Sequence, residues 1–203
     1  MLAILNYGMA NLRSVQKAFA AVGHDARIVE QPSEALRADR LVLPGVGAAG
    51  DALAKLRQRG LDEALLAHID AGRPFLGICL GLQMLFDICQ EGGEHRGLGV
   101  LRGRVVALRP PTRLGLKVPH MGWNTLEVRR PSPLLAGLPE GASVYFVHGY
   151  HALCEEEQDI AAVTDYGGPV VASVWRGNVV AAQFHPEKSQ AVGLRMLSNF
   201  AAM

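Results

Sequence analysis

The sequence predicts a three-layer, flavodoxin-like α/β fold in which helices cover both faces of a mostly parallel sheet. In the first half of the chain, short apolar runs alternate with stretches of helical periodicity, as in parallel strands joined by helices. After Gly93 the pattern changes to short strands and turns, so additional antiparallel strands are expected in the C-terminal half. A chain of 203 residues is long enough for one well-packed domain, and we expect residues 1–203 to form a single domain.

The elements of the first half follow from hydrophobic spacing and from the positions of Gly and Pro. In chain order they are strand 2–5, helix 11–21, strand 26–29, a short helix after Pro32, strand 41–43, helix 52–69 and strand 74–78. A further helix is expected to begin at Leu80 and to include Cys89. The second half is expected to hold strands over 100–108, 125–128, 144–150, 170–175 and 179–184, with a hairpin turn at 176–178 and a closing helix over 190–201.

The composition is that of an ordinary globular protein, with 49% hydrophobic residues and a net charge of +1. No apolar stretch approaches the ~20 residues that cross a bilayer, and no charged leader precedes a signal-type core. We therefore expect a cytoplasmic protein without a membrane partner. The basic residues between Arg102 and Lys117 lack interleaved aromatic residues, which favours a solvated face or a protein-binding surface over nucleic acid.

Three widely spaced cysteines do not form a disulfide framework or a Cys-x-x-Cys zinc pair. His148, His151 and Cys154 recur every third residue, but residues three apart on a strand point to opposite faces. No metal site and no cofactor are therefore expected.

Cys79 is the strongest candidate for a functional residue. It lies in Gly77-Ile78-Cys79-Leu80-Gly81, where an apolar strand passes into a helix. This is the arrangement of a nucleophile elbow, with sulfur in place of oxygen, and the two glycines provide clearance for the neighbouring backbone. A helix start beside the sulfur also favours the thiolate. The alternative is a small buried hydrophobic residue, which is the commonest role of a free cysteine and the one expected for Cys89.

His185-Pro186-Glu187 supplies a base and an orienting carboxylate for such a nucleophile. The proline biases His185 to extended backbone, so that His185 and Glu187 are expected to project to the same side. A carboxylate beside an imidazole fixes its tautomer and stabilises the imidazolium. Taken alone, the three residues fit a surface strand exit equally well.

Pro44-Gly45-Val46-Gly47 follows the strand at 41–43 and is expected on the same rim as Cys79, because the carboxyl ends of parallel strands meet at one edge. It is either a simple turn or a source of backbone N–H donors for an oxyanion. The N–H of Leu80 would be the second donor in an elbow.

These motifs, together with Gln83 one helical turn after Cys79, resemble those of the class I, triad-type glutamine amidotransferases. The resemblance covers essentially the whole chain. Within that family, Pro119-His120-Met121-Gly122-Trp123-Asn124, residues 145–150 and Lys188-Ser189 are most similar to the glutaminase subunits of imidazole glycerol phosphate synthase.

The resemblance implies hydrolysis of glutamine to glutamate and ammonia, with Cys79 as nucleophile, His185 as proton carrier and Glu187 as its orienting group. It implies an oxyanion hole made by Val46 or Gly47 with Leu80. The residues that it assigns to glutamine binding are Gly47, Gln83, Gly149 and Tyr150. One departure is Gly149, where relatives often carry Ser or Thr. Gln83 fits this role independently, since residues one turn apart share a helix face.

Ammonia needs a consumer, and we expect no second domain in the chain that would bind an acceptor. The resemblance implies a heterodimer with a (β/α)8-barrel cyclase that combines ammonia with a phosphoribulosyl aminoimidazole-carboxamide nucleotide (PRFAR), giving imidazole glycerol phosphate and AICAR in histidine biosynthesis. The candidate docking residues are Asn11, Trp123, Asn124 and Lys188. Their alternative roles are a helix cap for Asn11, a core residue for Trp123 and a solvated charge for Lys188.

Two other functions remain open from the residues. One is a glutaminase subunit of another synthase, of the pyridoxal phosphate or anthranilate type, although those relatives usually lack the Met-Gly-Trp-Asn run. The other is a non-catalytic regulatory protein on the same fold, since a fold does not fix a function. The intact set of Cys79, His185 and Glu187 argues against the second.

Overall fold

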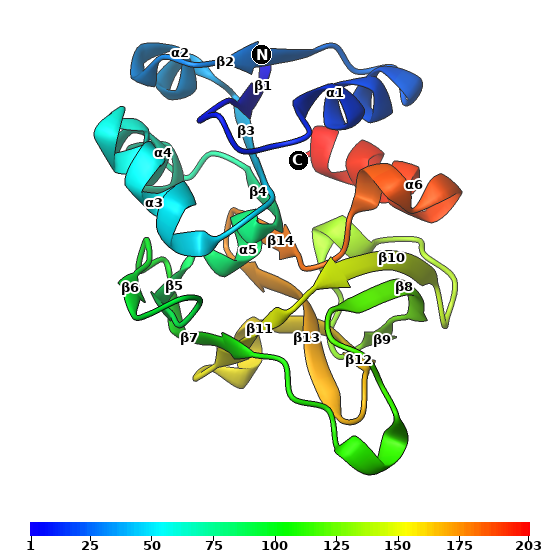
Figure 1. Cartoon of the computed structure of the whole chain (residues 1–203). Helices are drawn as coiled ribbons and strands as arrows, with labels where there is room; N and C mark the ends of the chain where they lie inside the picture. The colour runs from blue at the N-terminus through cyan, green and yellow to red at the C-terminus, as the bar shows by residue number, and fades with distance from the viewer.

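The protein is built around one eight-stranded sheet (Figure 1), which a computed structural model describes together with the rest of residues 1–203. The order of its strands is β2-β1-β3-β4-β14-β13-β12-β9. The first five are mutually parallel, and β13, β12 and β9 continue the sheet in antiparallel pairing. Their bounds are β1 Leu2–Leu5, β2 Ala26–Val29, β3 Arg40–Gly45, β4 Phe75–Cys79, β9 Glu127–Val128, β12 Ile160–Asp165, β13 Pro169–Arg176 and β14 Val179–Ala182.

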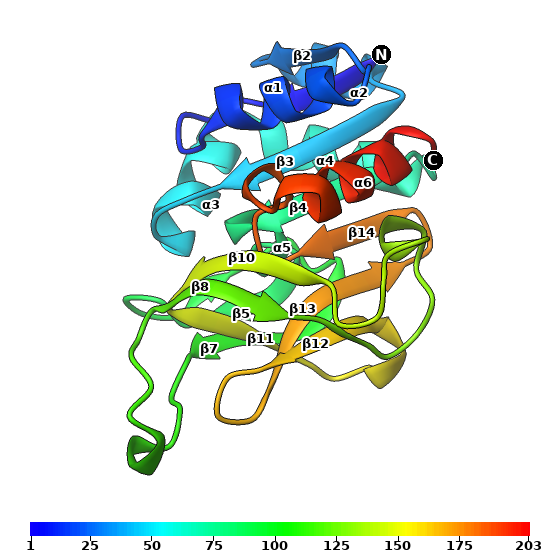
Figure 2. The same cartoon turned by 90° about the vertical axis from the view of Figure 1, so that its right-hand side faces the viewer.

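Helices cover both faces of the parallel half of this sheet. Helices α1 (Leu12–Ala21) and α6 (Gln190–Ala201) lie side by side on one face, as Figures 1 and 2 show. Helices α2 (Pro32–Arg37), α3 (Ala49–Gln58) and α4 (Leu61–Asp70) cover the other face. On α1 the buried side chains are Val15, Ala18 and Phe19, whose spacing of three and four residues puts them on one stripe of the helix.

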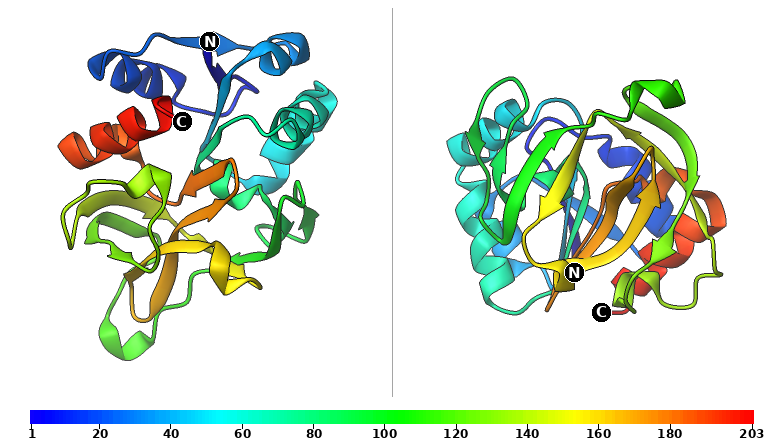
Figure 3. Two further views of the ribbon diagram at one scale, coloured as in Figure 1. Left: turned by 180° about the vertical axis from the view of Figure 1, so that it is seen from behind. Right: turned by 90° about the horizontal axis from the view of Figure 1, so that it is seen from below.

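Two small sheets replace the helices as outer layers over the antiparallel half. Strands β8 (His120–Thr125) and β10 (Ser143–His148) form an antiparallel pair on the side of α1 and α6 (Figure 2). The second sheet has the order β11-β7-β5-β6 and lies on the side of α3 and α4 (Figures 1 and 3). Its strands are β5 Phe86–Cys89, β6 His95–Arg96, β7 Leu101–Ala107 and β11 Tyr150–Cys154. The α/β class and the mostly parallel sheet are as predicted.

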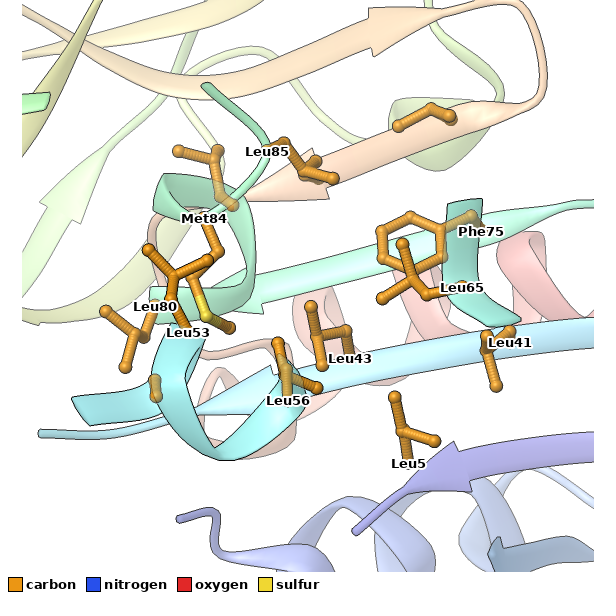
Figure 4. Packing of buried hydrophobic residues seen from close by; sticks show 14 of the residues in the cluster. Leu5, Leu41, Leu43, Leu53, Leu56, Leu65, Phe75, Leu80, Met84 and Leu85 are labelled. Atoms are coloured by element: carbon orange, nitrogen blue, oxygen red, sulfur yellow. The ribbon is translucent and has the colours of Figure 1, made fainter. Parts of the chain in front are cut away.

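Two hydrophobic clusters hold the layers together, one on each face of the main sheet. Figure 4 shows part of the cluster beneath α3 and α4, where side chains of the sheet meet those of the two helices and of the segment after Cys79. Leu43, Leu53, Leu56, Phe75, Leu80 and Met84 are among its buried members. The other cluster, which includes Phe19, Phe146, Phe184 and Phe200, lies beneath α1, α6 and the β8–β10 pair.

Two predicted helices differ from the structure. The single helix expected over 52–69 is two helices, because Gly60 adopts φ +62 between α3 and α4 and no helix continues through that conformation. The helix expected from Leu80 to Cys89 ends at Gln83, and Cys89 lies on strand β5. Short apolar runs such as Leu82–Phe86 do not distinguish a buried helix from a buried strand, and the pairing of β5 with β7 decides the outcome.

The C-terminal half contains more strands than the sequence predicted. The expected hairpin is present, with β13 and β14 joined by a turn in which Gly177 has φ +56. The strand expected over 144–150 comprises β10 from its second residue to its end at His148, and the first residue of β11, Tyr150. The strand expected over 125–128 divides into the end of β8 and β9. Most of β8, β11 and β12 was not predicted, because these strands are defined by partners far away in the chain.

Candidate active site

Cys79 lies at the carboxyl end of β4, where α5 (Leu80–Gln83) begins. Its backbone has φ +54 and ψ −106, a conformation that non-glycine residues rarely adopt and that a nucleophile elbow requires. The side chain is almost buried, with 7% of the residue exposed. The sharp turn that the sequence predicted is therefore present at this cysteine.

The two glycines beside Cys79 are required by close backbone approaches. A Cβ on Gly77 would lie 2.8 Å from the carbonyl oxygen of Gly81. A Cβ on Gly81 would lie 1.9 Å from the carbonyl oxygen of Leu43 on the adjacent strand β3. The elbow therefore packs its own backbone against β3 at distances that only glycine permits.

His185 and Glu187 project to the same side, as predicted, and form a buried pair. The Nδ1 atom of His185 lies 2.7 Å from Oε1 of Glu187, and their side chains are 4% and 2% exposed. Pro186 begins a single 3₁₀ turn over Pro186–Lys188, which brings the two side chains together. Burial opposes the imidazolium, but the thiolate of Cys79 and the carboxylate of Glu187 outweigh it and raise the pKa of His185 to about 9.

The parallel pairing of β3, β4 and β14 brings these segments to one rim. Gly45 pairs with Cys79, and Ala182 pairs with Ile78, so that the residues following each strand lie next to one another. Cys79 and His185 line one cavity of about 260 Å³, close to the lower limit of ~300 Å³ for ligand pockets. A larger hollow of about 700 Å³ beside α1 and β2 contains no nucleophile.

The cavity also contains the residues to which glutamine binding was assigned. Gly47, Gln83, Gly149 and Tyr150 all line it, as do Val46 and Leu80. Nε2 of Gln83 donates to the carbonyl oxygen of Tyr150 at 2.9 Å and to Oε1 of Gln183 at 3.0 Å. The sequence therefore predicted a set of residues that the fold gathers around one space.

The two expected oxyanion donors are in different states. Leu80 is the first residue of α5, so its N–H has no intrahelical acceptor. The N–H of Val46 donates to the carbonyl oxygen of Met9 at 3.1 Å and is therefore not free to bind an oxyanion in this conformation. Gly47 adopts φ +87, which suits glycine. Of the two candidate donors in this turn, Val46 is the one that is already occupied.

Two residues of the site had no role in the sequence analysis. Glu91 lines the cavity, and its Oε2 accepts the N–H of Ala49 at the start of α3 at 2.9 Å. Gln183 is fully buried, and its Nε2 lies 3.7 Å from Sγ of Cys79. Gln183 belongs to the His-Pro-Glu segment and was therefore within reach of sequence reasoning, whereas nothing in the sequence around Glu91 places it near Cys79.

The candidate docking residues do not all share one surface. Trp123 is 49% exposed and packs edge-on against Tyr145, while Nζ of Lys188 lies 5.8 Å from the centre of the same Tyr145 ring. Asn124 faces the other side of β8 from Trp123, because side chains alternate along a strand. Its Nδ2 donates to the carbonyl oxygen of Asp165 at 2.8 Å, so its side chain is not part of that patch.

Asn11 takes the N-cap position of α1, but its side chain makes no capping hydrogen bond and is exposed. No group of three or more His, Cys, Asp or Glu side chains is arranged to hold a metal ion. None of the helices is both long enough and apolar enough to cross a membrane.

Comparisons with known proteins agree with this geometry. Residues 3–203 match the family described as glutamine amidotransferase class-I. The imidazole glycerol phosphate synthase subunit HisH of Syntrophotalea carbinolica is 52% identical over 206 residues, covering 100% of both chains. The HisH subunit of Aquifex aeolicus is 52% identical over 97% of this chain and 94% of its own.

Solved structures of more distant proteins have the same fold. One described as a glutamine amidotransferase superposes with a TM-score of 0.76 at 21% identity and covers 100% of both chains. The PurLQS structure from Thermotoga maritima gives a TM-score of 0.75 at 17% identity and covers 99% of this chain and 97% of its own. With a family match over almost its whole length and relatives at half identity, the chain belongs to the class-I glutamine amidotransferases and, among them, to the HisH subunits of imidazole glycerol phosphate synthase.

Proposed function

We propose that this chain hydrolyses the side-chain amide of glutamine with Cys79 as nucleophile, His185 as proton carrier and Glu187 as the group that orients His185. The observation that carries the proposal is that a strained cysteine elbow lines the same cavity as His185, whose imidazole is paired with the buried carboxylate of Glu187. A thiol, an imidazole and a carboxylate in this relation are the components of covalent acyl transfer.

The reaction proceeds in two halves. The Cys79 thiolate attacks the amide carbon of glutamine, and the His185 imidazolium gives its proton to the departing nitrogen, so that ammonia leaves and a thioester remains. Neutral His185 then removes a proton from water, and the resulting hydroxide attacks the thioester. Glutamate departs and the thiolate is restored with His185 protonated. The raised pKa of His185, about 9, fits a resting state in which the imidazolium is already formed.

The cavity also presents groups of complementary charge and polarity to the α-ammonium group and the amide of glutamine. Glu91 supplies a carboxylate for the α-ammonium group, and Gln83 makes both of its protein hydrogen bonds through Nε2, which leaves Oε1 as an acceptor. Gly47, Gly149 and Tyr150 line the remaining wall with backbone and side-chain groups. A substrate carrying both an ammonium group and an amide fits this set better than a purely apolar one.

Full activity requires a change in the turn at Val46. Leu80 offers one N–H to the oxyanion, and of the two candidates for the second donor we propose Val46, whose N–H becomes free once its bond to the Met9 carbonyl breaks. Each oxyanion donor contributes on the order of 3 kcal/mol to the barrier. A chain with Val46 bonded to Met9 is therefore expected to turn over slowly.

We further propose that residues 1–203 form a single domain that works in the cytoplasm as a heterodimer with a (β/α)8-barrel cyclase. The exposed Trp123 and Lys188, both in contact with Tyr145, are suited to face this partner close to the cavity mouth, which Lys188 lines. The cyclase combines the ammonia with PRFAR and forms imidazole glycerol phosphate and AICAR.

The test is glutamate release by the purified chain, alone and with the cyclase and its nucleotide. We expect slow hydrolysis alone and a rise of orders of magnitude in the complex, because binding must release Val46. Cys79→Ala is expected to abolish glutamate release in both states while the complex still forms. Equal rates with and without the cyclase would refute the coupling, and full activity of Cys79→Ala would refute the mechanism.

A further inference from the structure

A chain of buried amides runs from the pocket wall to the sulfur of Cys79. Nε2 of Gln183 lies 3.7 Å from Sγ, and Oε1 of Gln183 accepts from Nε2 of Gln83 at 3.0 Å. Nε2 of Gln83 also donates to the carbonyl oxygen of Tyr150 at 2.9 Å. Gln83 and Gln183 are 5% and 0% exposed, so neither amide competes with bulk water.

The carbonyl of Tyr150 fixes the direction of every amide in this chain. A carbonyl oxygen only accepts, so the Gln83 amide must turn its nitrogen toward Tyr150. The same nitrogen also faces the Gln183 amide, which must therefore present its oxygen as the acceptor. The Gln183 amide is thereby left with its nitrogen toward Cys79, and an N–H group, not an oxygen, meets the sulfur.

The Tyr150 carbonyl is itself held by a second donor. Nδ1 of His148 lies 2.9 Å from it, which requires the proton of neutral His148 to be on Nδ1. Nε2 of His148 then accepts from Nδ1 of His120 at 3.0 Å. Burial lowers the pKa of both histidines to about 4, so both are neutral near pH 7 and this arrangement persists.

We propose that Gln183 is a further catalytic residue of the Cys79 site, whose N–H stabilises the thiolate, and that Gln83 is the positioning residue that orients the Gln183 amide. The proposal rests on the role of Cys79 as the nucleophile. A hydrogen bond from an N–H to an anion is among the strongest in proteins, and a sulfur anion buried without donors is costly. One residue, Gln83, thus serves the substrate pocket on one side and the nucleophile on the other.

Each of the other charged or polar groups around the sulfur favours either the thiolate or the thiol form of Cys79. The imidazolium of His185 favours the thiolate, and Glu187 acts on the sulfur through His185. The carbonyl oxygen of Val147 on β10 lies 3.9 Å from Sγ and favours the thiol. Burial, and then the charge of Cys79, raise the pKa of Tyr7, so that its hydroxyl stays neutral. Gln183 is therefore the neutral donor that offsets the Val147 carbonyl.

The test is the pH dependence of Cys79 alkylation by iodoacetamide in the whole chain, followed by mass spectrometry of the Cys79 peptide. Mass spectrometry distinguishes alkylation of Cys79 from alkylation of Cys89 and Cys154, and the measurement needs neither glutamine nor a partner. Gln183→Met keeps the length of the side chain and removes the donor. We expect its pH profile to move up by about one unit, and its alkylation at pH values below the midpoint of the profile to slow roughly tenfold, as for the loss of one charged hydrogen bond.

Two further variants and a control complete the test. Gln183→Glu, which puts carboxylate oxygens at the sulfur, is expected to shift the profile further than Gln183→Met. Gln83→Met leaves Gln183 in place but frees its amide to turn, so a smaller upward shift is expected. Ser173→Ala removes another fully buried hydrogen bond of the same sheet, from Oγ to the Ala181 carbonyl at 2.8 Å, and is expected to leave the profile unchanged.

The alkylation rate at high pH separates this role from simple packing. If Gln183 acts on the thiolate, every folded variant reaches the wild-type rate once the thiol is fully ionised. If the variants only distort the elbow, the rate at high pH falls as well and the pH profile does not move, which would overturn the proposal. If the Gln183 variants fail to fold, the pH profile of Cys79 alkylation in Gln83→Met is the test. A wild-type profile in Gln83→Met would also overturn the proposal.

Discussion

The elbow at Cys79 and the turn at Pro44-Gly45-Val46-Gly47 face the same cavity but are held in different ways. Cys79 is almost buried, and the glycines around it pack against β3 and the start of α5. Val46 is 44% exposed, and its N–H is bonded to the carbonyl of Met9 instead of facing the cavity. The elbow is thus fixed by packing, whereas the turn is held by one backbone hydrogen bond at the surface.

This difference assigns the two regions different parts in catalysis. The proposed nucleophile Cys79 and the pair of His185 with Glu187 are held by buried contacts in the isolated chain. The second oxyanion donor depends on a backbone state in which the N–H of Val46 is bonded to the Met9 carbonyl. A partner that covers Val46 is therefore expected to act at the turn and not at the elbow.

The largest effect is expected from a methyl group placed in the elbow. In Gly81→Ala the new Cβ would lie 1.9 Å from the Leu43 carbonyl oxygen, so the backbone of β3 or of α5 must move. We expect a loss of about 3 kcal/mol in the free energy of unfolding, measured with urea, and no glutaminase activity. Gly72→Ala is the control, because Gly72 has open space around it, with φ +73. If Gly81→Ala is no less stable than Gly72→Ala, the elbow is not fixed by packing.

Glu187→Gln tests the buried pair behind the elbow. The carboxylate orients His185 and stabilises its imidazolium, and the loss of this group from a triad lowers kcat by up to ~10⁴-fold. We expect a fall of that order in the complex with the cyclase, with binding of the cyclase unchanged. A wild-type kcat would show that Glu187 does not orient the base.

The same variant changes the pH dependence of stability. The pKa of His185 rises from 6.5 to about 9 on folding, although burial opposes the rise, so the imidazolium stabilises the fold fully below about pH 6.5 and this contribution disappears as the pH rises through 9. The wild-type chain should therefore lose stability between these two pH values, by at most about 3 kcal/mol. In Glu187→Gln the loss should be smaller, as urea unfolding at a series of pH values would show.

A smaller effect is expected in the turn. Gly47 has φ +87, and a Cβ there would lie 2.9 Å from the flexible end of the Met9 side chain. Gly47→Ala should cost about 1 kcal/mol of stability, similar to Gly72→Ala, because both glycines have positive φ. It should also lower kcat in the complex by roughly 10 to 100-fold through a misplaced oxyanion donor.

In Gly47→Ala, the rate of Cys79 alkylation tests whether a change in the turn affects the elbow. If the two regions are held independently, Gly47→Ala alkylates at the wild-type rate in the isolated chain even though its kcat falls. Slower alkylation would mean that the turn and the elbow form one packed unit.

The smallest effect is expected at Gly149, which lines the same cavity. A Cβ there would lie 3.8 Å from Cγ1 of Val118, an ordinary contact, so Gly149→Ser should fold normally. The added hydroxyl provides one more hydrogen bond to glutamine, and KM should fall a few-fold with kcat unchanged. Gly149→Ala supplies the Cβ without the hydroxyl and should keep the wild-type KM. An equal KM in both variants would mean that the hydroxyl does not reach the substrate.

Prediction from the sequence was most successful where a structure depends on residues that are close together in the chain. The strand before Cys79, the turn at Cys79 and the hairpin at Gly177 follow from local rules about apolar runs and glycine. It was wrong at the helix predicted for 52–69, which Gly60 interrupts, and at Cys89, which lies on a strand. In the second case the apolar run is compatible with both structures, and only its pairing with β7 decides between them.

The sequence by itself determined where the nucleophile elbow lies and that His185 and Glu187 are adjacent, because flanking glycines, a proline and a two-residue spacing act within a few bonds. The tertiary structure alone decided that the Gln183 amide faces the sulfur, that Glu91 lines the cavity and that the Val46 N–H is bonded to Met9. These arrangements join segments far apart in the chain, and strand register and packing, which no local pattern encodes, determine which atoms meet.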